Sequence, residues 1–156
     1  MVKKEKANKT YSLDLLKKGE KNMSTSSKIG LQRKGENYVR AIYNHFDSYP
    51  SYLGNILFNN YNTEEKVEEL IDLGNASHIA ETLDKSKFYH RDMKRKGKEE
   101  PELYANENDF LAESGIYDYI YLFKNDEWYV CTFRNKKFIK LTQEIIDRNK
   151  VIENNF

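Results

Sequence analysis

Residues 117–133 read YDYIYLFKNDEWYVCTF, and this stretch contributes most to the fold prediction. Its two halves, residues 117–123 and 128–133, are dense in aromatic and β-branched residues, which favour β-strands. Between them, residues 124–127 (Lys-Asn-Asp-Glu) contain the asparagine and aspartate that suit a tight turn. The stretch therefore predicts a β-hairpin within the hydrophobic core.

Strand and helix patterns continue on both sides of this hairpin. Residues that alternate in polarity indicate strands, whereas apolar residues at helical spacing between a polar N-terminal residue and a glycine indicate helices. We expect strands at 28–33, 38–45, 87–93 and 138–141, and helices from Pro50 to Tyr61, from Asn62 or Thr63 to Gly74, over 107–113, and from Thr142 to about Val151. The predicted fold class is α+β, with a mostly antiparallel sheet and helices packed on one face.

The chain divides into a tail and one domain. Residues 1–27 are predicted to form a flexible, basic N-terminal arm, because lysine-rich flanks surround a short apolar patch and a polar stretch follows. A partner-binding helix within the arm is the alternative. Residues 28–156 are predicted to form a single α+β domain, since the chain is too short for two cores of ordinary size.

The composition limits where the protein works and what it contains. The formal net charge is +1, which gives no global attraction to nucleic acid or to an anionic membrane. Cys131 is the single cysteine, so a disulfide framework and a multi-cysteine zinc site are excluded. No run approaches the ~18 apolar residues that a membrane span needs. The sequence therefore predicts a cytoplasmic protein that does not enter a membrane.

The first candidate site is residues 45–50 (His-Phe-Asp-Ser-Tyr-Pro), where a predicted strand passes into a predicted helix. Histidine is the side chain most able to exchange protons near neutral pH, and Asp47 can orient His45 or join it in binding a metal. A helix N-terminus here also favours a bound anion. The alternative is structural: Asp47 or Ser48 caps the helix while His45 and Tyr49 pack against it.

The second candidate site is residues 89–92 (Tyr-His-Arg-Asp), on another predicted strand. If the two segments lie side by side, their histidines and carboxylates converge, and Arg91 holds a phosphate. The candidate catalytic residues are His45, Asp47, His90 and Asp92. We assign no metal ligand outright and identify no cofactor. A salt-bridged surface strand explains the second segment equally well.

Basic residues follow the second segment. Lys94, Arg95 and Lys96, near Phe88 and Tyr89, are of the kind that contacts a nucleic acid backbone and stacks on bases. A solvated loop is the alternative interpretation. The sequence contains no phosphate-binding glycine-rich loop, nucleophile elbow, HExxH motif or kinase signature. An enzyme is therefore the less favoured interpretation.

Several short motifs occur in a distinctive order along the chain. They are residues 23–29 (Met-Ser-Thr-Ser-Ser-Lys-Ile), residues 45–50, Gly54, the helix from Glu65 to Gly74, residues 89–92, and the aromatic residues 121–123 and 128–129. Together they resemble a family of small, uncharacterised phage and prophage proteins. Its members open with Met-Gly/Ser-Thr-Arg-Ser-x-Ile, carry His-Trp-Asp-Gly-Tyr-Pro, and show His-Arg-Asp before an aromatic hairpin. The resemblance covers about residues 23–133.

The departures from this family concern possible ligand contacts. Ser26 stands in place of the arginine of the opening motif, Phe46 in place of tryptophan, and Ser48 in place of glycine. If the motif residues bind a ligand, the missing arginine removes an anion contact. The chain is then expected to keep the fold while serving another purpose.

The resemblance implies a mobile-element origin and, by analogy, a counter-defence role in the host cytoplasm. We expect a phage-encoded binding protein that inhibits a host defence system, in the manner of an anti-CRISPR protein, by binding a protein or nucleoprotein surface. The aromatic hairpin, the basic loop or the arm would make the contact. The expected contact residues are Tyr49, Arg91, Lys94, Arg95, Lys96 and Trp128. The alternatives are a nucleotide- or phosphate-binding protein or metal-dependent enzyme built on the four candidate catalytic residues, and an accessory phage protein.

Overall fold

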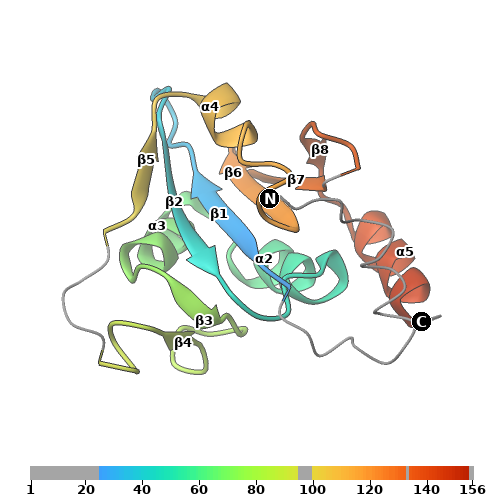
Figure 1. Cartoon of the computed structure of the whole chain (residues 1–156), viewed down its shortest axis with the longest axis horizontal. Helices are drawn as coiled ribbons and strands as arrows, with labels where there is room; N and C mark the ends of the chain where they lie inside the picture. Colours follow the sequence, from blue (N-terminus) through green and yellow to red (C-terminus); the bar gives the residue numbers. More distant parts are fainter. Residues whose placement is uncertain (1–24, 95–99, 133, 155–156) are drawn as a thin grey trace.

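The computed structural model describes residues 25–94, 100–132 and 134–154 (Figure 1). The strands are β1 (Ser27–Leu31), β2 (Val39–Asn44), β3 (Ala76–His78), β4 (Lys87–Phe88), β5 (Glu102–Tyr104), β6 (Tyr119–Lys124), β7 (Glu127–Thr132) and β8 (Ile139–Lys140). The helices are the π-helical η2 (Pro50–Gly54), α2 (Asn55–Asn60), α3 (Glu64–Asp72), α4 (Glu107–Leu111) and α5 (Gln143–Asn154). The α+β class is therefore confirmed.

The strands form one sheet in the order β4-β3-β2-β1-β6-β7-β8, and β5 also pairs with β2. The two predicted hairpins, β1–β2 and β6–β7, are antiparallel as expected. However, β1 pairs in parallel with β6, and β2 pairs in parallel with β3. The prediction of a mostly antiparallel sheet is wrong, and the sheet is mixed. Turn residues fix the direction of neighbouring strands in a hairpin, but they carry no information about strands that are distant in sequence.

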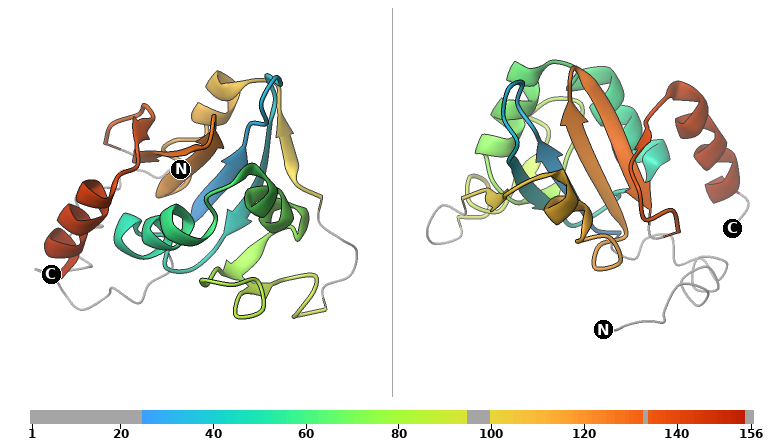
Figure 2. Two further views of the ribbon diagram at one scale, coloured as in Figure 1. Left: turned by 180° about the vertical axis from the view of Figure 1, so that it is seen from behind. Right: turned by 90° about the horizontal axis from the view of Figure 1, so that it is seen from above.

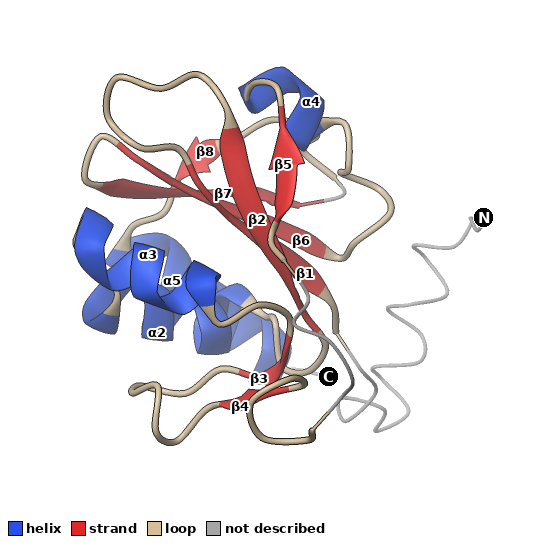
Figure 3. Cartoon of the chain, turned by 90° about the vertical axis from the view of Figure 1, so that its left-hand side faces the viewer, coloured by secondary structure: helices blue, strands red, loops and turns tan. Residues whose placement is uncertain are grey.

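The main core lies between the sheet and the helices η2, α2, α3 and α5 (Figure 3; Figure 2, left). Alternate strand residues such as Ile29, Ile42 and Tyr121 point into it. The remaining helix, α4, packs on the opposite face, where Phe110 joins Val39, Ile120 and other residues in a second cluster. The prediction of helices on one face thus holds for all described helices except α4. We call the face beside α4 the open face.

Helix ends follow the sequence signals. The Thr63 hydroxyl accepts a hydrogen bond of 3.2 Å from the backbone N–H of Lys66, and acidic Glu64 stands in the first turn of α3. Gly74 has a φ of +83°, the left-handed conformation typical of the residue after a helix. The Thr142 hydroxyl accepts from the N–H of Ile145 at the start of α5. These predictions are confirmed.

The sequence prediction misses β3 and β5, and several of its boundaries shift, two of which concern the predicted site and the arm. The predicted strand at 87–93 ends at Phe88, because the chain then turns and the N–H of Asp92 donates to the carbonyl of Phe88. The predicted arm ends earlier than expected, since Ser27 already begins β1 and is fully buried. Residues 1–24 lie outside the described residues.

None of the described helices has the length and apolar character needed to cross a membrane.

Candidate functional site

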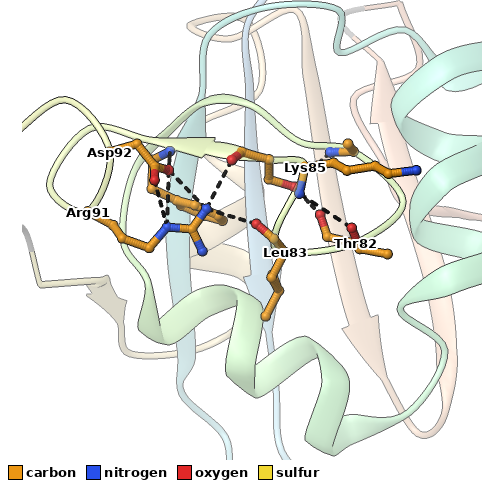
Figure 4. A network of polar contacts seen from close by, with 8 residues as sticks. Thr82, Leu83, Lys85, Arg91 and Asp92 are labelled. Atoms are coloured by element: carbon orange, nitrogen blue, oxygen red, sulfur yellow. Dashed lines mark hydrogen bonds and ion pairs between the residues drawn. The ribbon is translucent and has the colours of Figure 1, made fainter.

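The second predicted site is a self-contained turn after β4 (Figure 4). The Arg91 guanidinium points back into its own loop, where Nη2 donates to the carbonyl oxygens of Leu83 at 2.8 Å and Ser86 at 3.0 Å. Its Nε donates to Asp92 at 3.0 Å, and its Cζ lies 5.0 Å from the centre of the Phe88 ring. The arginine is thus engaged in holding the loop, and it is not placed as the phosphate-binding residue that the sequence predicts.

Asp92 has a structural role in the same turn. One carboxylate oxygen accepts a hydrogen bond of 2.8 Å from the N–H of Phe88. The Arg91 hydrogen bond, followed by this backbone hydrogen bond, holds the pKa of Asp92 below its usual range, because both favour the ionised carboxylate. Asp92 is therefore a charged support of the turn, and its place among the candidate catalytic residues stays a prediction.

Replacement of Arg91 by lysine tests this structural role. A lysine keeps the charge but cannot hold two carbonyl groups and a carboxylate with one planar fork. We expect the free energy of unfolding to fall by roughly 1–2 kcal/mol, the cost of about one lost hydrogen bond to a charged group on a partly exposed loop. Urea denaturation checks this value. If R91K unfolds like the wild type but loses affinity for inorganic phosphate, the arginine is a ligand contact after all.

The two predicted sites lie on either side of β3. The N–H of His45 donates to the carbonyl of Ala76 at 3.0 Å, and the N–H of Tyr89 donates to the carbonyl of Asn75 at 3.1 Å. The segments are thus near one another, as expected, but one strand separates their backbones by roughly 10 Å, twice the strand spacing. Within the described residues, no group of three or more histidine, cysteine, aspartate or glutamate side chains is arranged to hold a metal ion. The four candidate residues therefore do not assemble a metal site.

The first predicted site is a turn that three strands hold in place. Asp47 adopts a φ of +59°, which is uncommon for a residue with a side chain. The amide of Asn44 on β2 donates to the carbonyl of Phe46 at 2.8 Å and to the hydroxyl of Ser48 at 2.9 Å. Ser48 and Ser27 of β1 share a hydroxyl–hydroxyl hydrogen bond of 2.7 Å. Ser48 is thus a support of the turn.

A third strand, β6, also holds this turn, which exposes the ring of Phe46. The hydroxyl of Tyr121 on β6 donates to the carbonyl of Ser48 at 2.7 Å. The residue before the following helix is Tyr49, and its side chain makes no capping bond. Phe46 keeps 39% of its surface exposed in this firmly held turn. Rigid turns with exposed aromatic rings are suited to recognition, because little order is lost on binding.

From Phe46 a continuous series of aromatic rings runs onto the open face. The Phe46 and His45 ring centres are 4.3 Å apart, those of His45 and Tyr43 are 5.8 Å apart, and those of Tyr43 and Tyr117 are 5.8 Å apart. The Tyr43 hydroxyl and Nδ1 of His45 also share a hydrogen bond of 2.6 Å. The two separations of 5.8 Å fall within the range of favourable aromatic pairs, and the edge-to-face pair of Phe46 and His45 is slightly closer than that range.

Lys28 of β1 extends the series to Tyr104. Its Nζ lies 5.6 Å from the centre of the Tyr117 ring and 5.8 Å from that of Tyr104, within reach of a cation–π interaction. Lys28 is only 5% exposed, and its ammonium group is paired with the carboxylate of Glu102. We call the set Phe46, His45, Tyr43, Tyr117 and Tyr104, with Lys28 between the last two, the aromatic row.

The tyrosines of the row remain protonated. Burial raises the pKa of Tyr43, and the neighbouring Tyr89, Tyr117 and Asp118 raise it further. Burial, followed by the charges of Glu113 and Glu102, also raises the pKa of Tyr117. At neutral pH these residues therefore offer rings and hydroxyl groups, and they do not act as bases. This chemistry suits binding.

No protein-family model, curated protein or solved structure matches this chain. The resemblance to phage and prophage proteins therefore stays a prediction.

The residues predicted to contact a partner differ in how exposed they are in the structure. Trp128 is a correction: it is 3% exposed, and its Nε1 donates to the carbonyl of Tyr61 at 2.7 Å, so it belongs to the core. Tyr49 is half-buried beside Tyr119. Lys94 is exposed, whereas Arg95 and Lys96 lie outside the described residues.

Four members of the aromatic row were not predicted from the sequence. For Tyr43 a signal existed, since residues two apart on a strand share a face and Tyr43 precedes His45 by two. Nothing local pairs Lys28 with Tyr117 or Tyr104, because β1, the loop before β6, and β5 come together only in the folded chain.

Proposed function

We propose that this protein is a binding protein that docks a partner macromolecule on the aromatic row. The observation that carries the proposal is the unbroken contact from exposed Phe46 to Tyr104 across the open face. Aromatic residues are enriched at the energetic centres of protein interfaces, because they bury a large area with few rotatable bonds. The firmly held turn at Asp47 supports the same proposal, since it presents Phe46 in one conformation.

We further propose that the partner is a host defence protein or nucleoprotein complex, which this protein inhibits in an anti-CRISPR-like way. The resemblance of residues 23–133 to phage and prophage proteins supports this role. Trp128, the hairpin residue predicted to make the contact, is buried. The row takes its place as the main contact, and the basic residues Lys94, Arg95 and Lys96 are a second contact in this proposal.

Site-specific photo-crosslinking tests the row directly. p-Benzoylphenylalanine placed at position 46 should give a discrete adduct in bacterial cells, whereas the same residue at position 52 should not. Tyr52 is a matched control, since it is 38% exposed and Phe46 is 39% exposed, and Tyr52 bonds to His78 instead of a residue of the row. Added wild-type protein should compete the adduct away, and F46A should need at least about tenfold more protein to do so, as for a binding hot spot.

Two results separate the binding surface from its role. Equal adducts at positions 46 and 52, or equal competition by F46A, would disprove the row as the docking surface. The role is measured as phage plating on a strain with an active CRISPR–Cas system, where the wild-type protein should raise the plating efficiency and F46A should not. If the adduct at position 46 and the weak competition by F46A are both observed, but the wild-type protein gives no gain in plating, the defence role is wrong and the binding function stands.

A further inference from the structure

Strand β5, which carries Tyr104 of the aromatic row, forms an outer edge of the sheet (Figure 1). It pairs antiparallel with β2 along one side, and no strand in the described part of the chain pairs with its other side. The side chain of its middle residue, Leu103, is 64% exposed. A strand of this kind can accept a further strand, because its outward backbone groups remain available for hydrogen bonds.

Two hydrogen bonds at the end of β2 show how its backbone groups are directed. The N–H of His45 donates to the carbonyl of Ala76 on β3 at 3.0 Å, and the N–H of Tyr43 donates to the side chain of Asn75, directly before β3, at 2.9 Å. Both groups therefore point to the side of β2 on which β3 and β5 lie, since β1 occupies the other side. Backbone groups of residues two apart in a strand point the same way, so those of Ala41 point toward β5.

This direction determines which groups of β5 face outward. Ala41 lies opposite Glu102, and these two residues form a hydrogen-bonded pair. Such pairs alternate with pairs that make no hydrogen bond, so Leu103, opposite Arg40, belongs to the second kind. The N–H and the C=O of Leu103 therefore point away from β2, toward the free side of β5.

The free side of β5 offers one residue that can pair fully. Pro101, before the strand, has no N–H, and the chain bends at Ala105, just after the strand. Leu103 supplies one donor and one acceptor next to each other. The same residue of a second copy, running antiparallel, supplies the matching acceptor and donor. Leu103 can therefore pair with itself across a two-fold axis.

The side chains agree with this register. The two exposed Leu103 side chains would lie on one face and cover each other, and Glu102 of each copy would lie opposite Tyr104 of the other. A shift that pairs Leu103 with Pro101 would place Glu102 opposite Glu102, where like charges repel, and would lose hydrogen bonds at the proline. Charge and hydrogen bonding thus favour the same arrangement.

From this geometry we infer that the free edge of β5 binds a second copy of this chain, with the two strands paired antiparallel through Leu103 in one continuous sheet. The inference is independent of the proposed binding function, because it needs no other protein. Residues that are opposite in a sheet share a face, so the dimer presents two aromatic rows on the same side. Because each strand has only three residues, we expect a weak dimer with a Kd of about 0.1 mM.

Analytical ultracentrifugation of the full chain tests the inference, at protein concentrations from about 10 μM to about 1 mM, on both sides of the expected Kd. The wild type should change from monomer to dimer over this range. Leu103→Pro should stay monomeric, because proline removes the outward N–H. It should unfold at nearly the same urea concentration as the wild type, since an edge strand tolerates proline where the N–H faces solvent.

A matched pair of variants distinguishes edge pairing from general attraction between apolar side chains. Leu103→Asp places two like charges opposite each other and should raise the Kd at least about tenfold. Ile116→Asp introduces the same charge at another exposed apolar residue, which is 69% exposed. It should change the Kd less than about twofold, because Ile116 lies outside β5.

A cysteine at position 103 reports the register. The Cα atoms of a hydrogen-bonded antiparallel pair lie about 5.5 Å apart, within the span of a disulfide. Mild oxidation should therefore link Leu103→Cys into a dimer, whereas Ile116→Cys should stay monomeric. The native Cys131 is 1% exposed and should not contribute.

Several results would contradict the inference. It is wrong if the wild type stays monomeric over the whole range, if L103P associates as the wild type does, or if I116D and L103D weaken association equally. An L103P variant that unfolds much more easily would mean that the N–H of Leu103 bonds within its own chain, which also contradicts it. If the wild type stays monomeric and L103P no longer competes for the adduct at position 46, the edge binds a strand of another protein instead of a second copy.

Discussion

Replacing Trp128 with alanine should lower the free energy of unfolding by about 3–5 kcal/mol, the usual cost of deleting a fully buried large aromatic side chain. Trp128 is 3% exposed and meets the edge of Phe123 at a ring separation of 5.2 Å. Its Nε1 donates to the carbonyl of Tyr61, just beyond the end of α2. The substitution therefore opens a cavity between the hairpin and the helices and also leaves that carbonyl without its donor.

The measurement is urea denaturation followed by circular dichroism, since W128A removes the only tryptophan fluorophore. Trp128→Phe is the matched variant, because it keeps an aromatic ring and loses the indole N–H. We expect W128F to lose roughly 1–3 kcal/mol, the cost of leaving the Tyr61 carbonyl buried and unpaired, and to form the adduct at position 46 normally. If W128F keeps its stability but loses that adduct, then Trp128 is the partner contact that the sequence predicts.

The elements that the sequence predicts well are those whose signals are local. Thr63 and Gly74 mark the two ends of α3, and both act as expected. The turn at residues 124–127 sets the direction of β6 and β7, since two adjacent residues, Asn125 and Asp126, take up left-handed conformations there. In each case the deciding groups lie within a few residues of one another, so the printed sequence contains the whole interaction.

The parallel pairing of β1 with β6 is the main feature that local signals cannot supply. Ile29 lies opposite Tyr121, although most of the chain separates them. The alternation within each strand predicts which residues share a face, but it does not predict which strands are neighbours. The mixed sheet follows from this pairing and from that of β2 with β3, for which α2 and α3 provide the crossover.

For the candidate site, too, the sequence predicts the local features and misses the contacts between distant segments. The sequence identifies His45 and its turn, because a histidine and an aspartate occur close together at a predicted strand–helix junction. The predicted strand over Arg91 and Asp92 is wrong: strand alternation would place the two side chains on opposite faces, whereas the turn brings them together at 3.0 Å. The sequence does not predict Lys28 as a site residue, because its aromatic partners come from β5 and from the loop before β6.

Gly30→Ala is the second substitution with a large expected effect. A Cβ atom at Gly30 would lie 2.7 Å from Cγ1 of Val39 and 2.8 Å from Cε2 and Cζ of Phe110. Val39 belongs to β2 and Phe110 to α4, and the two close over the open face of β1. Because the methyl group cannot fit without displacing one of them, we expect a loss of about 3 kcal/mol, at the upper end of the range for an overpacked core.

Gly54→Ala is the matched control, because Gly54 has helical φ and ψ of −57° and −43°. Its Cβ would meet Leu141 and Tyr121 at an ordinary 3.6 Å. We expect G54A to gain up to about 1 kcal/mol, as alanine favours a helix over glycine. Chemical denaturation of both variants should thus show shifts of opposite sign, and a stable G30A would mean that α4 does not pack on β1.

A rescue experiment connects Gly30 with the aromatic row. Phe110→Leu removes the ring atoms that the new methyl group would strike, so the loss in the double variant should be smaller than the sum of the two single losses. Glu113 and Tyr117 directly follow α4 in the chain. A displaced α4 should therefore move them away from Lys28, and G30A should compete for the adduct at position 46 less well than the wild type. If G30A is unstable but competes for that adduct as well as the wild type does, the position of α4 does not determine the geometry of the row.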